Sequence, residues 1–325
     1  MTDQTTQSDR SDQAAQTAQS DRPHPHARPE PVVSPFNVPV VEEFRANGGH
    51  VGGMFEGGDL LLLTTTGARS GREYTNPLGY LRVDDRLLVV ASAGGSSRDP
   101  DWYRNLLAHP MVVVELGTER FEAVAVPTEG AERDRLFEEV VRREPGFGDY
   151  ESRSGRRLPV VELQPAALES AGEVTNLAEK LFEVHGWLRG QLDRVREEAE
   201  AYLAEHAGSG APVGLNLQIR QHCLAFCESL HFHHSGEDGV FPGLAQGYPH
   251  LREPIERLIA EHRVVDRIRG ELERLLADLA TADPDRFRAE LDRMSRELNA
   301  HLDFEEESLI PVLSQIPFPP PTPAE

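Results

Sequence analysis

Histidine and glutamate recur four residues apart in two segments near the end of the sequence. His233 and Glu237 form the first pair, and His301 and Glu305 form the second. Residues four apart lie on one face of an α-helix with their Cβ atoms about 5–6 Å apart, so each pair can ligate one cation or two adjacent cations. Imidazole and carboxylate suit iron, manganese or zinc, and a carboxylate can bridge two such ions.

Two further histidines lie on other segments whose apolar residues have helical spacing. With them, the predicted ligands are His185, His233, Glu237, His262, His301 and Glu305. Six ligands exceed the four of a tetrahedral zinc site, so the sequence predicts two metal ions with bridging carboxylates. The alternative is that these histidines are buried residues with ordinary hydrogen-bond partners. His222 would lie about 16 Å from His233 along a helix, and it is left out of the set together with His231 and His234.

The elements that must hold these ligands are long helices. Helical periods cover residues 172–206, 214–235, 250–280 and 284–310 with short connections between them. This pattern predicts an all-α, up-down four-helix bundle over residues 167–316. Gly236 and Gly239 flank Glu237, so the second helix is expected to fray or bulge there. Cys223 and Cys227 are expected to be small buried residues on that helix.

The first half of the chain has a different sequence pattern, with short β-rich runs in place of long helical periods. Short β-rich runs occupy residues 60–66, 72–83, 86–92, 111–117, 120–127 and 158–163. Helices are predicted near 38–47, at 99–110 with Asp99 as its cap, and at 130–144. Short antiparallel strands with few helices indicate a small barrel of the α+β class over residues 36–166.

Two glycine-containing loops in this region could bind an anion. The first holds Gly67, Ser70 and Gly71 beside Arg69 and Arg72. The second contains Ser92, Gly94, Gly95 and Arg98 and runs into a helix N-terminus. Exposed amides with guanidinium groups suit phosphate or carboxylate, although glycine-rich loops often only turn the chain.

Composition bounds the remaining possibilities. The formal net charge of −22 argues against nucleic acid and anionic membranes as partners. No apolar run reaches the roughly 20 residues of a membrane span, and no signal segment is evident, so a cytoplasmic protein without stable membrane insertion is expected. Residues 1–35 are predicted to be a disordered tail, and residues 317–325 a proline-rich one.

The histidine and glutamate pattern of residues 172–313 resembles the hemerythrin-like (HHE cation-binding) family. The resemblance implies a non-haem di-iron centre, with manganese or zinc as alternatives. Members of that family bind O2, sense oxygen or iron, or handle reactive oxygen and nitrogen species.

The two loops, followed by Trp102, Tyr103 and Asn105, resemble the deazaflavin (F420)-dependent nitroreductase family over residues 44–165. The resemblance implies a split β-barrel of the FMN-binding type, coenzyme F420 (alternatively FMN), and hydride transfer to quinone or nitro acceptors. It also suggests a homodimer through the barrel. The implied cofactor contacts are Arg69, Ser70, Tyr74, Thr75, Asn76, Pro77, Leu78, Gly79, Ser92, Ala93, Gly94, Gly95, Trp102, Tyr103, Arg104, Asn105 and Leu106. Tyr150, with Phe147 nearby in sequence, is the candidate substrate-side donor.

Together these resemblances suggest an F420H2-dependent oxidoreductase fused to a hemerythrin-like di-iron domain. The alternative is a protein that senses or binds oxygen, iron or nitric oxide, in which the barrel only sequesters a flavin-type cofactor.

Overall fold

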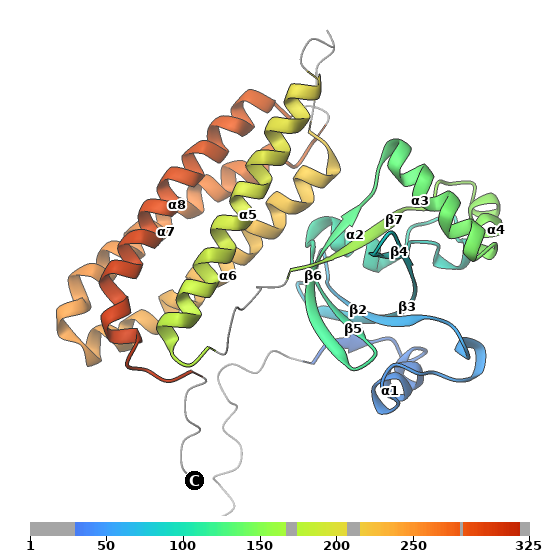
Figure 1. Ribbon diagram of the computed structural model, residues 1–325, viewed down its shortest axis with the longest axis horizontal. Helices are drawn as coiled ribbons and strands as arrows, with labels where there is room; N and C mark the ends of the chain where they lie inside the picture. Colours follow the sequence, from blue (N-terminus) through green and yellow to red (C-terminus); the bar gives the residue numbers. More distant parts are fainter. Residues whose placement is uncertain (1–29, 167–173, 207–214, 280–281, 319–325) are drawn as a thin grey trace, which may run out of the picture. The chain divides into compact units, whose positions relative to one another are not determined.

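The computed structural model describes residues 30–166, 174–206, 215–279 and 282–318 (Figure 1). Most of the predicted N-terminal tail, with His24 and His26, and the last residues of the proline-rich end lie outside these ranges. Residues 30–35 are described, and Val32 and Val33 form a short strand, β1 (Val32–Val33), parallel to β3 (Glu73–Val83). The predicted tail is therefore too long at its end, because backbone pairing holds these two residues.

Six antiparallel strands form a closed barrel. They are β2 (Leu60–Thr66), β3, β4 (Arg86–Val90), β5 (Met111–Leu116), β6 (Glu119–Pro127) and β7 (Val160–Pro165). Their order is β3-β2-β5-β6-β7-β4, and the pairing of β4 with β3 closes the ring. A two-residue turn joins β3 to β4, in which Asp84 and Asp85 have φ values of 49° and 63°, the left-handed backbone that tight hairpins require. The interior is filled by apolar residues such as Leu61, Val89 and Val114.

Helices also lie against the barrel. They are α1 (Val38–Ala46), η1 (Gly53–Phe55), η2 (Ala93–Gly95), α2 (Asp101–Ala108), α3 (Gly130–Arg143) and α4 (Gly146–Ser154). Asp99 does not cap α2, which has Pro100 at its N-cap position, because the Asp99 carboxylate pairs with Arg156 instead. Helix α4 is not among the helices predicted from the sequence.

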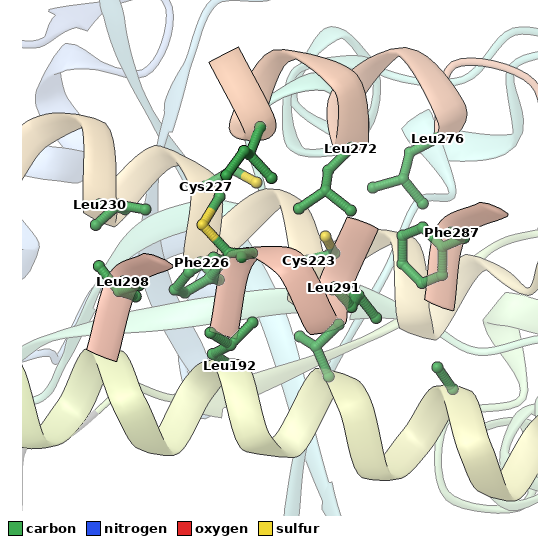
Figure 2. Packing of buried hydrophobic residues seen from close by; sticks show 14 of the residues in the cluster. Leu192, Cys223, Phe226, Cys227, Leu230, Leu272, Leu276, Phe287, Leu291 and Leu298 are labelled. Atoms are coloured by element: carbon green, nitrogen blue, oxygen red, sulfur yellow. The ribbon is translucent and has the colours of Figure 1, made fainter. Parts of the chain in front are cut away.

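Four long helices follow the barrel: α5 (Leu177–His206), α6 (Leu217–Gly247), α7 (Arg252–Leu275) and α8 (Pro284–Leu313), with η3 (Pro249–Leu251) before α7. Consecutive helices are in contact, and α5 also contacts α8, so the four form a closed bundle. Figure 2 shows its core, where Phe226, Leu272 and Leu291 meet. Cys223 and Cys227 are free and fully buried there, which confirms their expected place. The predicted α+β barrel and following all-α bundle are confirmed.

The second bundle helix is longer than the sequence predicted. We expected it to end at residue 235 and to fray at Gly236 and Gly239, but α6 continues to Gly247 and contains Pro242. Phe241 is buried against Leu251, Leu258 and neighbouring residues. Packing of this kind outweighs local helix propensity, so Glu237 lies on a regular helical turn. None of the helices in the described parts of the chain is long and apolar enough to cross a membrane.

Candidate metal centre and cofactor site

Imidazole and carboxylate groups from α5, α6 and α8 meet inside the bundle. His185 Nε2 lies 3.2 Å from His233 Nε2 and 3.5 Å from Glu305 Oε2. His233 Nε2 lies 3.0 Å from Glu237 Oε1. One ligand atom from each of these four residues lies within 4.8 Å of the others. We call this set the first donor group.

A second donor group shares Glu237 with the first. It consists of His234, Glu237, His262 and His301, whose ligand atoms also lie within 4.8 Å of one another. Glu237 Oε2 is 3.4 Å from His262 Nε2. Glu305 Oε2 is 3.7 Å from His301 Nε2 as well as 3.5 Å from His185 Nε2. Both glutamates therefore lie between two positions, as bridging carboxylates do.

Carboxylates contact the Nδ1 atoms of three of the histidines and so orient their Nε2 atoms towards the donor groups. His185 Nδ1 contacts Glu306 at 2.8 Å, His262 Nδ1 contacts Asp238 at 2.8 Å, and His301 Nδ1 contacts Glu261 at 3.0 Å. When Nδ1 donates its hydrogen to a carboxylate, Nε2 keeps a lone pair directed inward. This arrangement orients imidazoles for a metal ion.

Several of the inward atoms have no hydrogen-bond partner among the described residues, although they are buried. They are Nε2 of His234, His262 and His301, both carboxylate oxygens of Glu237, and Glu305 Oε2. Such groups ordinarily cost free energy when left unpaired in an interior. Their donor chemistry fits two transition-metal ions, which would ligate all of them at once.

Burial and mutual proximity shift the acidity of these groups. Burial, with the neighbouring His185, lowers the pKa of His233 to about 3. Burial, with the nearby Glu305, raises the pKa of Glu237 well above its usual range. Burial opposes ionisation of Glu305, but the hydrogen bond and charge of His185 outweigh it and lower the pKa of Glu305. The imidazole of His233 is therefore neutral at neutral pH, the form that ligates metals.

All six predicted ligands meet here, and the structure adds His234. His234 is not among the ligands predicted from the sequence. However, His234 is three residues before Glu237, so it also shares a helix face with that carboxylate. Its ring stacks on His262 with 4.1 Å between centroids. His222 lies elsewhere, fully buried with Nδ1 2.6 Å from Glu198, consistent with its exclusion.

The first predicted cofactor loop is the turn between β2 and β3. Arg69 and Ser70 are exposed there. The Asn105 side chain on α2 accepts a hydrogen bond from the Ala68 N–H at 3.1 Å and donates one to Thr65 Oγ1 at 3.2 Å. The turn is therefore fastened to the helix that follows the second loop.

The second predicted loop is held by an arginine that the sequence argument did not single out. Arg156 donates to the carbonyl oxygens of Ala91 at 2.8 Å, Ser96 at 3.1 Å and Ser92 at 3.3 Å. It also pairs with Asp99 at 2.6 Å. Between these anchors the backbone takes positive φ at Ala93, Gly94 and Gly95, a conformation that needs such support. The sequence did not indicate this role because Arg156 is about 60 residues away from the loop along the chain.

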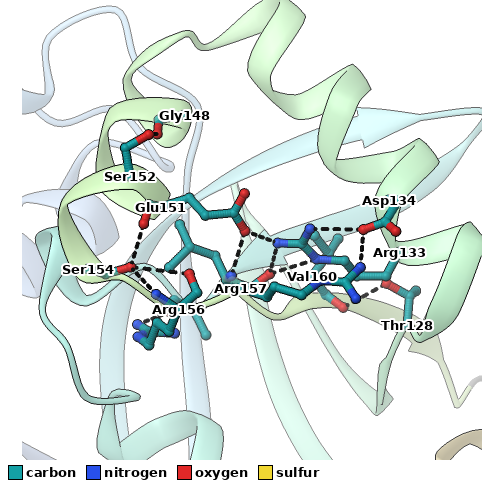
Figure 3. Close-up of polar contacts among 12 residues, drawn as sticks. Thr128, Arg133, Asp134, Gly148, Glu151, Ser152, Ser154, Arg156, Arg157 and Val160 are labelled. Carbon is teal, nitrogen blue, oxygen red and sulfur yellow. Dashed lines mark hydrogen bonds and ion pairs between the residues drawn. The ribbon is translucent and has the colours of Figure 1, made fainter.

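Tyr150, the candidate substrate-side donor, packs beside this loop. Its Cδ1 atom lies 3.3 Å from where a Cβ would stand on Gly95, and the Arg153 guanidinium is 5.0 Å from its ring centroid. Tyr150 lies on α4, and Figure 3 shows polar contacts that hold this helix, among them that of Arg133 with Glu151. Arg133 also donates a hydrogen bond to the Leu158 carbonyl oxygen. These contacts place α4, and with it Tyr150, against η2.

Some of the other residues that were predicted to contact the cofactor are exposed, and some are buried. Trp102 and Leu106 pack in the barrel core, so they support α2 and offer no exposed side chain to a cofactor. Tyr103 is partly buried and packs against the same core, Asn105 is also partly buried, and Arg104 is exposed. On β3, Thr75 is buried and hydrogen-bonded to Thr64 at 2.7 Å, while Tyr74, Asn76, Pro77, Leu78 and Gly79 are partly or fully exposed.

Comparison with known proteins assigns the barrel. The family model described as F420H(2)-dependent quinone reductase matches residues 39–165. F420H(2)-dependent quinone reductases of two Mycobacterium tuberculosis strains are 39% identical to this chain over 124 residues, which is 37% of this chain and 83% of each relative. The chain belongs to the F420H(2)-dependent quinone reductase family.

This member of the F420H(2)-dependent quinone reductase family carries a second recognisable region. The family model of the hemerythrin HHE cation binding domain matches residues 176–313, the range of the helical bundle. Among solved structures, an F420-H2 dependent reductase is 33% identical over 33% of this chain and 94% of its own, with a TM-score of 0.31. Both predicted family resemblances are confirmed.

Proposed function

We propose that this protein is an F420H2-dependent oxidoreductase that reduces quinone- or nitro-type acceptors, and that its helical bundle holds a non-haem di-iron centre that binds or reacts with O2 or related small molecules. We further propose a barrel domain over residues 36–166, a bundle domain over 167–316, and a cytoplasmic location. Family membership supports the barrel's role. The observation that carries the bundle's role is that two donor groups share Glu237.

Reduced F420, when bound, supplies a hydride. The chain's own residues would bind and orient it. Arg69 and Arg72 lie exposed around the first loop, where their charges suit the anionic part of the cofactor. Arg156 holds the second loop in its strained conformation. The Tyr150 phenol, beside that loop, would donate a hydrogen bond to the oxygen of the acceptor.

In the bundle, His185 and His233 would ligate one iron, and His234, His262 and His301 the other, with Glu237 and Glu305 between them. Glu306, Asp238 and Glu261 would hold the imidazole rings in the required tautomer. Manganese or zinc fits the same donors, and FMN is the alternative barrel cofactor.

One preparation tests both halves. Full-length protein from a deazaflavin-producing host should contain two iron ions per chain and should reduce a quinone with F420H2 over many turnovers. The His234→Gln variant should retain about one ion, whereas the His250→Gln control, altered at an exposed histidine, should retain two. Binding of F420 without turnover would contradict the oxidoreductase and favour the sensing or binding function. Wild-type protein without stoichiometric metal would contradict the di-iron centre.

A further inference from the structure

A cavity of about 190 Å³ opens between α6 and α7 beside the second donor group. Its lining includes His234 and His262, whose Nε2 atoms are buried and have no hydrogen-bond partner among the described residues. The cavity therefore reaches from the surface to two of the proposed metal ligands.

Groups that can bind a cation line this cavity at increasing depth. The side chains of His231 and Asp266 are 59% and 57% exposed, and that of Asp238 is 49% exposed. Behind them, His234 and His262 are only 7% and 5% exposed. Nitrogen and oxygen donors thus continue from solvent to the centre, which is the chemistry that a divalent cation requires on its way inward.

Two carboxylates, Asp238 and Asp266, and two guanidinium groups, Arg263 and Arg269, lie on the cavity wall. Arg269 is already matched by Asp266 and by Glu273. Arg263 is exposed at the edge and forms no ion pair with any other residue that the structure describes. It is the one unmatched cation among the cavity residues that the structure describes, so it should slow the approach of positive ions.

Among the described residues that line the cavity, none belongs to the first donor group. His185 and Glu305 are 0% and 1% exposed, and His233 and the shared Glu237 are 11% and 12% exposed. Behind His185, Glu306 contacts its Nδ1 and is itself bound by Arg189 at 2.7 Å. Glu306 and Arg189 thus cover the first donor group behind His185, whereas the second donor group borders the cavity.

We propose that the cavity between α6 and α7 is the passage through which divalent metal ions enter and leave, and that the ion held by His234, His262 and His301 exchanges first. This inference rests on the proposed metal centre. It assigns the passage to His231, Ser235, Asp238, Arg263 and Asp266, none of which the centre itself uses as a ligand.

A charge reversal tests the passage without touching a ligand. Uptake of Fe2+ by the metal-free full-length chain would be followed by stopped-flow absorbance under anaerobic conditions. Arg263→Glu should accelerate uptake several-fold, most strongly at low ionic strength. The control Arg267→Glu makes the same change at an exposed residue of α7 outside the cavity. Equal rates for the two variants would overturn the proposal.

A steric block provides the second measurement. Ser235→Trp, at an exposed serine of the cavity wall, should slow the first phase of Fe2+ release to a coloured ferrous chelator several-fold while leaving two ions bound at equilibrium. Ala260→Trp, exposed on α7 outside the cavity, should release at the wild-type rate. Wild-type release from Ser235→Trp would overturn the passage alone, whereas a wild-type chain that binds no Fe2+ would overturn the metal centre.

Discussion

Glu237 shows how a ligand can lower the stability of the metal-free protein. Its raised pKa, caused by burial and by Glu305, means that the stabilising contribution of the protonated carboxyl is present below its unfolded value of 4.5 and is lost as pH rises through the folded value. At pH values above 4.5, Glu237 therefore makes the metal-free fold less stable than it is at low pH. A bound cation would remove that penalty.

We therefore expect Glu237→Gln to stabilise the metal-free chain while weakening metal binding. At neutral pH the free energy of unfolding should rise by about 1 kcal/mol, because a buried charged group without a partner costs more than a neutral amide. Urea denaturation of metal-free protein, with iron analysis of loaded protein, measures both effects. Glu307→Gln, at an exposed residue of α8, should change neither. A less stable metal-free Glu237→Gln variant at neutral pH would contradict the argument.

His233 gives the opposite dependence on pH. Its pKa falls from 6.5 to about 3, chiefly through burial, so the unfolded chain binds more protons between these values. The stabilising contribution is present above pH 6.5 and is lost as pH falls towards 3. In urea titrations of the metal-free chain, His233→Gln should lessen this loss of stability, whereas His250→Gln should retain it. Equal slopes in both variants would show that another group governs acid sensitivity.

At the scale of elements, two kinds of pattern predicted the fold. The four bundle helices follow from apolar periodicity, because burial on one face requires it, and the six barrel strands follow from short β-rich runs. The end of α6 did not follow, since Phe241 keeps the helix intact past Gly239 through contacts distant in sequence. The missed α4 has the same cause: Arg133 and Glu151 hold it, and neither is adjacent to the other along the chain.

The sequence likewise predicted only part of the candidate site. The four-residue spacing pointed to His233, Glu237, His301 and Glu305, and helical periodicity added His185 and His262 to the predicted ligands. Only the three-dimensional structure shows that His234 stacks on His262. Likewise, the loop containing Gly94 was visible in the sequence, whereas its support by Arg156 was not. Local patterns identify groups that share a helix or turn; they do not identify partners supplied by another element.

The support of the second loop by Arg156 leads to a prediction at this scale. Replacing it with methionine removes the donors to Ala91, Ser92 and Ser96 but keeps a similar volume, so the loop should lose its strained shape. The Kd and KM for F420H2 should rise about tenfold, as expected when more than 1 kcal/mol of loop order must be restored on binding. The rate at saturating cofactor should change little.

The adjacent Arg157→Met variant is the matched control, because Arg157 is more exposed and pairs with Asp134 instead of the loop. It should bind F420H2 as the wild type does. Fluorescence titration with F420 and steady-state kinetics separate affinity from turnover. If Arg156→Met lowered the saturated rate and left the Kd unchanged, its role would not be to position the cofactor loop.

At the scale of the whole molecule, each region has apolar clusters of its own. Leu61, Val89 and Val114 belong to a cluster within the barrel, and Phe226, Leu272 and Leu291 to one within the bundle. Regions with separate cores can unfold in separate steps. A ligand that binds one folded region stabilises that region by about 2.7 kcal/mol at a concentration 100-fold above its Kd.

Scanning calorimetry of the full-length chain should therefore resolve two transitions that respond to different ligands. Metal ions should raise the unfolding temperature of one transition and F420 that of the other, each by several degrees for regions of this size. The His301→Gln variant should lose part of the metal response and keep the F420 response, because it removes a proposed ligand of one ion and lies in the bundle alone. A single transition whose temperature both ligands raise would mean that the two regions unfold together. Metal binding in the bundle would then also stabilise the barrel and its cofactor loops.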